Sequence, residues 1–429
     1  MRKLLYIMTI AVMLSAVPIG CRPDDYADEH TVRLEFSADT VSFDTVFTTM
    51  GTATRQLKVY NRTGHDVELG HVTLLHGRQS RFRLNVDGDT SLVARNIELQ
   101  SGDSMFIFVQ ACINPTLSTE PMLCTDSIMF SNGQSVMLEA YGRDAVYHRL
   151  ARGDSGWFCR IDCNTWDHSR PHVILSPAAV MEGNILSLTA GDELYFGDGA
   201  MLIIDSAASL DARGSADRPI LFTSLRRGEE WYRQLPGGWL FIWFYNYSTG
   251  NTIDHAVIEN GTAGIRCYPA SQVNMSNCIV RQMSDAGVVG QNATVNVSNS
   301  LVYDCYSALA LIGGGEYTFR GSTFADYWNY VGKVRDTAAV IISTHYYLPD
   351  GSYTGADIRR ADFTDCIIYG NRSNEVAINS LPPFAMHYSF TNCLVRGGEW
   401  DDDPMFANVE EDDYHLADDS PATGIGYQY

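Results

Sequence analysis

The feature that most constrains the fold of this 429-residue chain is a motif that recurs every 22 residues. The copies match column by column in the type of side chain that stands at each position. The residues that anchor the copies are Ile253, Met275, Val297, Phe319, Phe363 and Phe390. The step from Phe319 to Phe363 is twice 22, so we expect a decorated coil there, with Ile341 at the intermediate position. A repeat of this length is typical of stacked structural units.

The columns of the repeat predict the path of one coil. Two residues after each anchor stands a residue type that tolerates turn conformations, such as Asn277 or Asn299. The next column is small and includes Cys278, Cys366 and Cys393, which we interpret as buried packing residues rather than redox groups. A turn followed by a strand in every copy describes a parallel β-helix, whose coils stack at about 4.8 Å.

One column leaves two interpretations open. It lies between the small column and the next apolar column, both of which we place inside the β-helix. Side chains alternate along a strand, so this column should point outward, yet its residues are apolar. Its members are Val257, Ile279, Leu301, Ile367 and Leu394. Either these residues form an exposed stripe, or the assignment of inward and outward positions is wrong there.

Residues 30–147 carry a different pattern, in which apolar and polar residues alternate over short runs. Phe82–Val86 and Met105–Val109 are examples, and turn sequences such as Asn132-Gly133 separate the runs. About seven short strands over this length predict an Ig-like antiparallel β-sandwich. We see no catalytic constellation in it and interpret it as a spacer or docking module.

The first 21 residues predict an export signal. A basic start is followed by an uncharged run over residues 4–20 that ends at Cys21. This order predicts a bacterial lipoprotein signal, with lipid attached to Cys21. An ordinary secretory signal is the alternative, because Pro18 stands where lipoprotein signals usually carry Leu. Residues 22–29 are acidic and predict a flexible tether.

The charge balance excludes one class of partner. The chain has 30 Lys and Arg against 51 Asp and Glu, a formal net charge of −21. Nucleic acid binding needs clustered basic residues, so we expect no nucleic acid partner. No paired CxxC or HxxxH motif predicts a metal site.

Several segments of the repeat region carry a family resemblance. Gly214–Ser224, Asn260–Ile265 and the closing segment at Asp403–Phe406 are among them. They resemble the right-handed parallel β-helix lipoproteins of Bacteroidetes, in which an Ig-like module precedes the repeats. The resemblance implies right-handed coils and a lipid anchor in the outer membrane, facing the cell exterior. We expect the β-helix over residues 170–400 and a capping segment over residues 401–429.

The main candidate for ligand binding is the column of residues that directly follow the inward apolar residue of each copy, as Glu259 follows Ile258. We expect these side chains to point outward. Stacked polar, cationic and aromatic groups could line a sugar chain, whereas a solvated face of ordinary composition is the alternative. The column contains Glu259, Arg281, Tyr303, Ala325, Tyr369 and Arg396. Tyr327 and Trp328 are further glycan-binding candidates, because insertions such as residues 327–361 often gather on the functional face of a repeat protein.

The sequence gives weaker indications of catalysis. Asp304 and Asp326, with Glu259 nearby, are the only adjacent carboxylates on this face that could act in glycoside hydrolysis. The acidic runs Asp401–Asp403 and Glu410–Asp413 could bind Ca²⁺, but they lack the glycine and the spacing of a calcium loop. A solvated cap explains them better, so we expect no cofactor and no metal.

We therefore predict an all-β, surface-anchored lipoprotein whose β-helix binds a polysaccharide or a surface protein without catalysis. The alternative is a β-helix polysaccharide lyase or glycoside hydrolase. The negative charge disfavours a polyuronate substrate unless Ca²⁺ intervenes.

Overall fold

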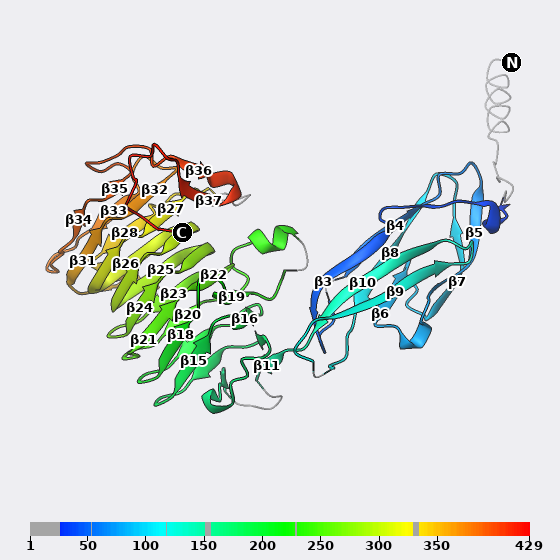
Figure 1. Cartoon of the computed structure of the whole chain (residues 1–429), viewed down its shortest axis with the longest axis horizontal. Coiled ribbons are helices and arrows are strands. Elements are labelled where there is room, and N and C mark those ends of the chain that lie inside the picture. Colours follow the sequence, from blue (N-terminus) through cyan, green and yellow to red (C-terminus); the bar gives the residue numbers. More distant parts are fainter. Residues whose placement is uncertain (1–25, 53, 117, 151–155, 228–229, 329–333) are drawn as a thin grey trace, which may run out of the picture. The chain divides into compact units, whose positions relative to one another are not determined.

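The structure is a computed structural model that describes residues 26–52, 54–116, 118–150, 156–227, 230–328 and 334–429. The chain separates into two compact units, Met1–Arg143 and Asp144–Tyr429, and the described regular elements of both are strands, apart from a few short helices (Figure 1). The predicted signal and its lipidation residue, Cys21, lie outside the described residues. None of the helices within the described ranges has the length and apolar character needed to cross a bilayer.

The first unit is a sandwich of two sheets. In spatial order, the first sheet contains β1 (Tyr26–Ala27), β5 (Asp66–Leu74), β9 (Met122–Phe130), β10 (Ser135–Arg143) and β3 (Thr40–Phe47), with β7 (Val93–Leu99) paired to β5. The second contains β2 (Glu35–Phe36), β4 (Arg55–Tyr60), β8 (Ser104–Ala111) and β6 (Phe82–Val86). Its short helices are η1 (Glu29–Thr31) and η2 (Gly77–Gln79).

Antiparallel pairing dominates this unit, as predicted. Only the pairs β1–β5 and β3–β10 are parallel among the described strands of the sandwich. Inward-facing side chains of both sheets, such as Leu69 of the first sheet with Leu57 and Phe82 of the second, form one hydrophobic core. The arrangement is consistent with the predicted Ig-like module.

The sandwich begins earlier than the sequence pattern indicates. β1 pairs with β5, and the Glu29 carboxylate accepts hydrogen bonds from the Gly70 amide at 2.9 Å and from the Ser131 hydroxyl. Part of the predicted tether at residues 22–29 therefore belongs to the folded unit. The alternation signal missed it because a two-residue strand is too short to show a period.

The second unit is a parallel β-helix in which each full coil contributes one strand to each of three stacked rows, A, B and C (Figure 1). Row A contains β11 (Val146–His148), β13 (His172–Ile174), β16 (Glu193–Phe196), β19 (Ile220–Ser224), β22 (Ala256–Glu259), the first parts of β25 (Ile279–Ser298) and β26 (Leu301–Arg320), β27 (Thr323–Asp326), β32 (Ile367–Gly370) and β35 (Leu394–Val395).

Rows B and C complete the coils. Row B contains β12 (Cys159–Arg160), β14 (Ala178–Val180), β17 (Leu202–Ile204), β20 (Ile242–Phe244), β23 (Ala263–Cys267), the middle of β25 and β26, β28 (Val340–Ser343) and β33 (Val376–Asn379). Row C contains β15 (Ile185–Thr189), β18 (Ser209–Arg213), β21 (Asn251–Asp254), β24 (Gln272–Ser276), the ends of β25 and β26, β31 (Ile358–Thr364) and β34 (Ser389–Thr391).

Smaller elements decorate the coils. They are the hairpin β29 (His345–Tyr347) and β30 (Tyr353–Gly355), the pair β36 (Phe406–Asn408) and β37 (Asp413–Leu416), and the helices η3 (Cys163–Thr165), η4 (Glu230–Gln234) and η5 (Val409–Glu411). The stacked sheet starts at β11, so the coils begin before residue 170, where the sequence pattern places their start.

The 22-residue columns are confirmed as stacks of equivalent side chains. Met275 lies opposite Val297, and Val297 lies opposite Phe319. The turn column has left-handed backbone, with φ of 53° at Asn277 and 40° at Asn299. The Asn299 side-chain amide donates to the Asn277 side-chain oxygen at 2.8 Å, so the turns of neighbouring coils are hydrogen-bonded.

The 44-residue interval is one long coil and not two. Phe319 lies directly opposite Phe363, with ring centroids 4.6 Å apart. Ile341, expected at an intermediate step, instead belongs to β28 in row B, opposite Ala310. Insertions on both sides of β28 account for the extra length.

The C-terminal segment, residues 401–429, runs back along the side of the β-helix (Figure 1). Its last residues bond to three successive coils. The Gly426 amide donates to the Asp365 carbonyl at 2.8 Å, the Tyr427 amide to Thr323 Oγ1 at 2.9 Å, and the Gln428 amide to Asn299 Oδ1 at 2.8 Å. The predicted cap is therefore a cover over one face.

This cover answers the question left open by the extra apolar column. Leu301, Ile367 and Leu394 are on the outside of row A, yet they are buried. Ile367 and Leu394 pack with Ala422 and Ile425 of the C-terminal segment. The assignment of inward and outward positions is thus correct, and the outward apolar stripe is shielded from water by the chain's own end.

The first two coils hold a pair of imidazoles, a half-buried His148 in β11 and a buried His172 in β13. His172 Nε2 donates to the Asp167 carbonyl at 3.0 Å, so its Nδ1 accepts from His148 Nε2 at 2.8 Å. The Trp166 ring stacks on His172 with centroids 3.5 Å apart. Burial lowers the pKa of each imidazole from 6.5 to about 4, so both are neutral at neutral pH.

We predict that the free energy of unfolding of the β-helix falls as the pH falls from about 6.5 toward 4. In this range the unfolded imidazoles take up protons that the folded pair excludes. By pH 4 the loss should be about 3 kcal/mol for each imidazole, since each pKa lies about 2.5 below its usual value and a difference of one corresponds to about 1.4 kcal/mol. Urea unfolding followed by tryptophan fluorescence measures it, because all 7 tryptophans lie in the second unit.

Carboxylates also titrate near this range, so the comparison needs a variant without the pair. His148→Gln/His172→Gln should show a shallower pH dependence than the natural protein, whereas His415→Gln, at an exposed position, should not. Identical slopes for the natural protein and the double variant would contradict the prediction.

Candidate functional site

The outer column defined above forms a chain of contacts on row A. Glu259 is 2% exposed and lies between two arginines. Its carboxylate accepts from Arg281 at 2.6 and 2.9 Å, from Thr223 Oγ1 at 2.9 Å, and from Arg227. Burial alone would raise the pKa of Glu259, but Arg281 and Arg227 outweigh it, and the pKa lies below its usual value. Glu259 is thus a buried counter-ion.

Arg281 links this carboxylate to the next coils. Its Nη1 donates to Tyr303 Oη at 2.9 Å and lies 3.9 Å from the Asp412 carboxylate. Tyr303 is buried, and its ring packs on Tyr414 with centroids 4.6 Å apart. Burial raises the pKa of Tyr303, so the phenol keeps its proton at neutral pH.

The residues at the C-terminal end of the column also contact other side chains of the protein. Arg396 Nη1 donates to Tyr369 Oη at 2.8 Å, and its guanidinium lies 5.1 Å from the centre of that ring. Tyr327 packs on Phe406 and Tyr414 of the C-terminal segment. Burial raises the pKa of Tyr327.

These contacts describe the surroundings of the predicted sugar-binding column. The candidates are brought together on one face, as the period requires, and they bond to one another. Tyr303, Tyr369 and Tyr327 also pack against the C-terminal segment, whereas the side chains of Arg281 and Arg396 are 32% and 38% exposed. The period predicts stacking, but it contains no information about what covers the stack.

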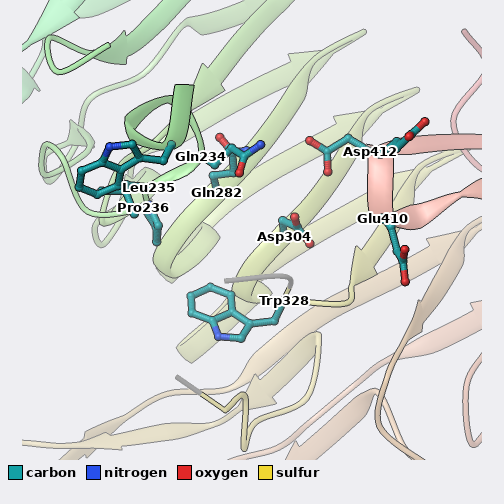
Figure 2. A pocket seen from close by; sticks show the side chains of 10 residues that line it. Gln234, Leu235, Pro236, Gln282, Asp304, Trp328, Glu410 and Asp412 are labelled. Atoms are coloured by element: carbon teal, nitrogen blue, oxygen red, sulfur yellow. The ribbon is translucent and has the colours of Figure 1, made fainter. Parts of the chain in front are cut away.

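Trp328 has a different position. It lines a cavity of about 590 Å³ on the side of the β-helix, which we call the side pocket. Figure 2 shows Asp304 between Gln282 and Asp412, with Trp328 on another wall. The lining residues are Trp231, Gln234, Leu235, Pro236, Gln282, Asp304, Trp328, Glu410, Glu411 and Asp412.

Four separate parts of the chain build the side pocket, and one of them is the segment after β27, which supplies Trp328. The loop at η4 supplies Trp231, the row A turns supply Gln282 and Asp304, and η5 with the residue after it supplies Glu410–Asp412. Trp231 is 53% exposed and stacks on Tyr232 with centroids 3.9 Å apart. Trp328 is buried and meets Tyr306 edge-on at 5.5 Å.

The floor belongs to a polar ladder, which is one residue beyond the outer column and consists of Asn260, Gln282, Asp304 and Asp326. The first three have left-handed backbone, with φ of 63°, 57° and 49°. Asn260 Nδ2 donates to Gln282 Oε1 at 2.9 Å, and Asp326 Oδ1 accepts from the Cys305 amide at 3.0 Å. The ladder thus repeats one polar side chain at coil spacing, and two of its members, Gln282 and Asp304, line the pocket, whereas Asn260 and Asp326 are completely buried.

The electrostatics of the wall are unusual on the C-terminal side. Burial raises the pKa of Asp412, although Arg281 and a hydrogen bond to Tyr303 act in the opposite direction. The Tyr414 hydroxyl is buried, and it has no hydrogen-bond partner within the described part of the chain. Burial raises the pKa of Tyr414, and the charges of Asp304 and Asp412 raise it further. The carboxylates therefore stand against a poorly solvated wall.

The pocket can hold a neutral or positively charged ligand better than an anion. In the described ranges, no group of three or more His, Cys, Asp or Glu is arranged to hold a metal ion. The acidic run Glu410–Asp413, weighed above for Ca²⁺, instead directs its first three residues to the side pocket.

Sequence reasoning found part of this site. The sequence pattern predicts Trp328 as a binding residue and Asp304 as a carboxylate of the outward face. The ladder position of Gln282 could have been found, since Asn260, Gln282, Asp304 and Asp326 are 22 residues apart. Trp231 was missed, because it lies in a non-repeating loop.

Comparison with known proteins supports the fold. The family model for the right-handed β-helix region matches residues 237–324, in agreement with the predicted handedness. No curated protein matches the chain at a significant level.

Solved structures give only remote likenesses. The catalytic unit of a GH87 α-1,3-glucanase from Streptomyces thermodiastaticus is 11% identical, with 80% of this chain and 76% of that chain covered and a TM-score of 0.20. A PapD-like domain of human CEP192 is 14% identical, with coverages of 30% and 95% and a TM-score of 0.18. A family 123 glycoside hydrolase from Clostridium perfringens is 4% identical, with coverages of 27% and 30% and a TM-score of 0.18.

Two tyrosines beside the pocket provide a matched test of the contacts. We predict that Tyr303→Phe lowers the free energy of unfolding by about 1–3 kcal/mol, because it leaves a partly buried arginine donor and a carboxylate without their hydroxyl partner. Tyr414→Phe should cost nothing or stabilise, since it removes a buried hydroxyl that has no partner among the described residues. Urea unfolding followed by tryptophan fluorescence compares them, and equal losses would contradict the assigned contacts.

Proposed function

We propose that this protein is a lipid-anchored cell-surface lipoprotein that binds carbohydrate without catalysing a reaction, and that the ligand lies in the side pocket. The observation that carries the proposal is the combination of two indoles with amide and carboxylate groups around one cavity. Ligand pockets of about 300–1,000 Å³ with a few convergent polar groups are the usual form of a small-molecule site. The volume of about 590 Å³ falls in this range.

The chemistry of the lining suits a sugar. A pyranose ring presents an apolar face, which an indole can cover, and hydroxyl groups around its edge. Gln234 and Gln282 offer both donors and acceptors to hydroxyls, whereas Asp304 and Glu410 offer acceptors. The indole of Trp231 is partly exposed and requires no rearrangement to meet a ligand.

The proposed location rests on the N-terminal sequence. A lipid on Cys21 would hold the processed chain at the outer membrane, with both folded units outside the cell, as in the Bacteroidetes lipoproteins that the repeat resembles. The sandwich would then act as a spacer between membrane and β-helix. Labelling with a radioactive fatty acid tests the anchor, and loss of label in Cys21→Ser is the expected result.

Binding is tested on a glycan array with the lipid-free chain of residues 22–429. We expect at least one glycan to bind, and Trp231→Ala to weaken it about tenfold or more, because stacking on one aromatic ring contributes on the order of 1 kcal/mol or more. Calorimetry with the best glycan of the array gives the affinities.

Trp157→Ala is the matched control, since Trp157 is 56% exposed, in the same unit, and not among the lining residues. Its affinity should stay within about twofold of the natural protein. Absence of any bound glycan, or equal loss in both variants, would contradict the proposal. Release of reducing or unsaturated ends from a bound glycan would replace it by the hydrolase or lyase alternative.

A further inference from the structure

The side pocket has a one-sided charge. Four of its lining residues carry carboxylates, namely Asp304, Glu410, Glu411 and Asp412, and none of its described lining residues is basic. Glu410 and Glu411 are exposed and form no ion pair with any described residue. Like charges gathered around a cavity with poorly solvated walls create a negative potential inside it.

The arginines behind the pocket do not cancel this potential. Arg281 approaches Asp412 at 3.9 Å, but its short contacts are to Glu259 at 2.6 and 2.9 Å. Arg227 also bonds to Glu259. Glu259 carries one negative charge against the two positive charges of Arg227 and Arg281, so one positive charge is left to offset the four carboxylates of the pocket. The charge around the pocket therefore stays negative.

A metal ion does not fit the arrangement. Ca²⁺ requires six to eight oxygens at about 2.3–2.6 Å, so its carboxylates must converge on one point. No such convergence of three or more ligand residues exists among the described residues. The carboxylates instead surround a cavity of about 590 Å³, which suits a cation carried on a larger molecule.

We infer that the side pocket selects a glycan with free, protonated amino groups, such as an oligomer of 2-amino-2-deoxyglucose, over N-acetylated and acidic glycans. This inference rests on the proposed carbohydrate-binding function and names its ligand class. An ammonium group meets the carboxylates of Glu410 and Glu411, while the ring face meets an indole. A cation beside Trp231 or Trp328 also gains from the negative face of the indole.

N-acetylated and acidic sugars should bind more weakly, for the same electrostatic reason. An N-acetyl group removes the positive charge from the sugar, so the carboxylates lose their partner. A uronate adds a negative charge to a pocket that already holds four carboxylates, and repulsion excludes it. The inferred order of affinity is therefore amino sugar, then N-acetylated sugar, then uronate.

Calorimetry with three hexasaccharides of equal length tests this order on the lipid-free chain of residues 22–429. The probes are hexamers of glucosamine, N-acetylglucosamine and galacturonate, at about pH 6, where the glucosamine amines are protonated. We expect the glucosamine hexamer to bind about tenfold or more tightly than the N-acetylated hexamer, and the difference to shrink between about 0.05 and 0.5 M salt.

Two charge-matched variants locate the effect. Glu410→Gln/Glu411→Gln should bring the two affinities together, because affinity for the glucosamine hexamer falls. Asp418→Asn/Asp419→Asn removes the same charge from exposed positions of the same segment outside the pocket, and should keep the difference. Both pairs are exposed, so the fold should tolerate them.

The outcomes separate the inference from the function on which it rests. Equal or tighter binding of the N-acetylated or galacturonate hexamer would overturn the inference and leave carbohydrate binding intact. Retention of the difference in Glu410→Gln/Glu411→Gln would also overturn it. Equal affinity for hexalysine would reassign the pocket to basic peptides. Absence of binding by all three hexamers, together with an empty glycan array, would remove the proposed function itself.

Discussion

In-register hydrogen bonding between successive coils is the constraint on which the structure of the second unit depends. Because every strand of a row pairs with the strand one coil away, residues at equal positions lie over one another, as the Phe319 and Phe363 rings do at 4.6 Å. Inside the β-helix this rule builds a continuous apolar stack. On the outside it aligns the turn amides of Asn277 and Asn299 and the polar ladder that forms the floor of the side pocket. Site chemistry can thus vary by side chain alone, while the backbone stays the same.

The same rule leaves an apolar stripe on the outside of row A, which a repeat protein must cover or expose to solvent. Here the C-terminal segment covers it, with Ile367 and Leu394 packed against Ala422 and Ile425. One segment therefore performs two tasks. It excludes water from the stripe, and at η5 it places Glu410–Asp412 opposite Asp304. The stability of the cover and the geometry of the pocket are consequently linked.

The features that repeat could be predicted from the sequence, and the features that occur once could not. The anchors, the left-handed turn at Asn277 and the burial of Cys278 follow from periodicity, because stacking places similar residues at equal positions. The burial of Glu259 does not follow, since Arg227 reaches it from a non-repeating loop. The contact between Asn299 and Gln428 spans 129 residues and has no periodic trace in the sequence. For this reason periodicity predicts that the outer column is a stack, but it does not predict which segments contact that stack.

The tail at Gly426–Gln428 has a consequence for how such a protein can change length. Its three amides engage Asp365, Thr323 and Asn299, one on each of three successive coils. A coil gained or lost between these positions would preserve every pairing between strands, yet it would displace the three bonds by one coil spacing of about 4.8 Å. The three hydrogen bonds of the tail can therefore form together only when the number of coils between Asn299 and Asp365 is unchanged. Duplication of a coil outside this span would leave the three hydrogen bonds intact. Within the span, the number of coils is constrained by Gly426–Gln428, which are not part of any repeat.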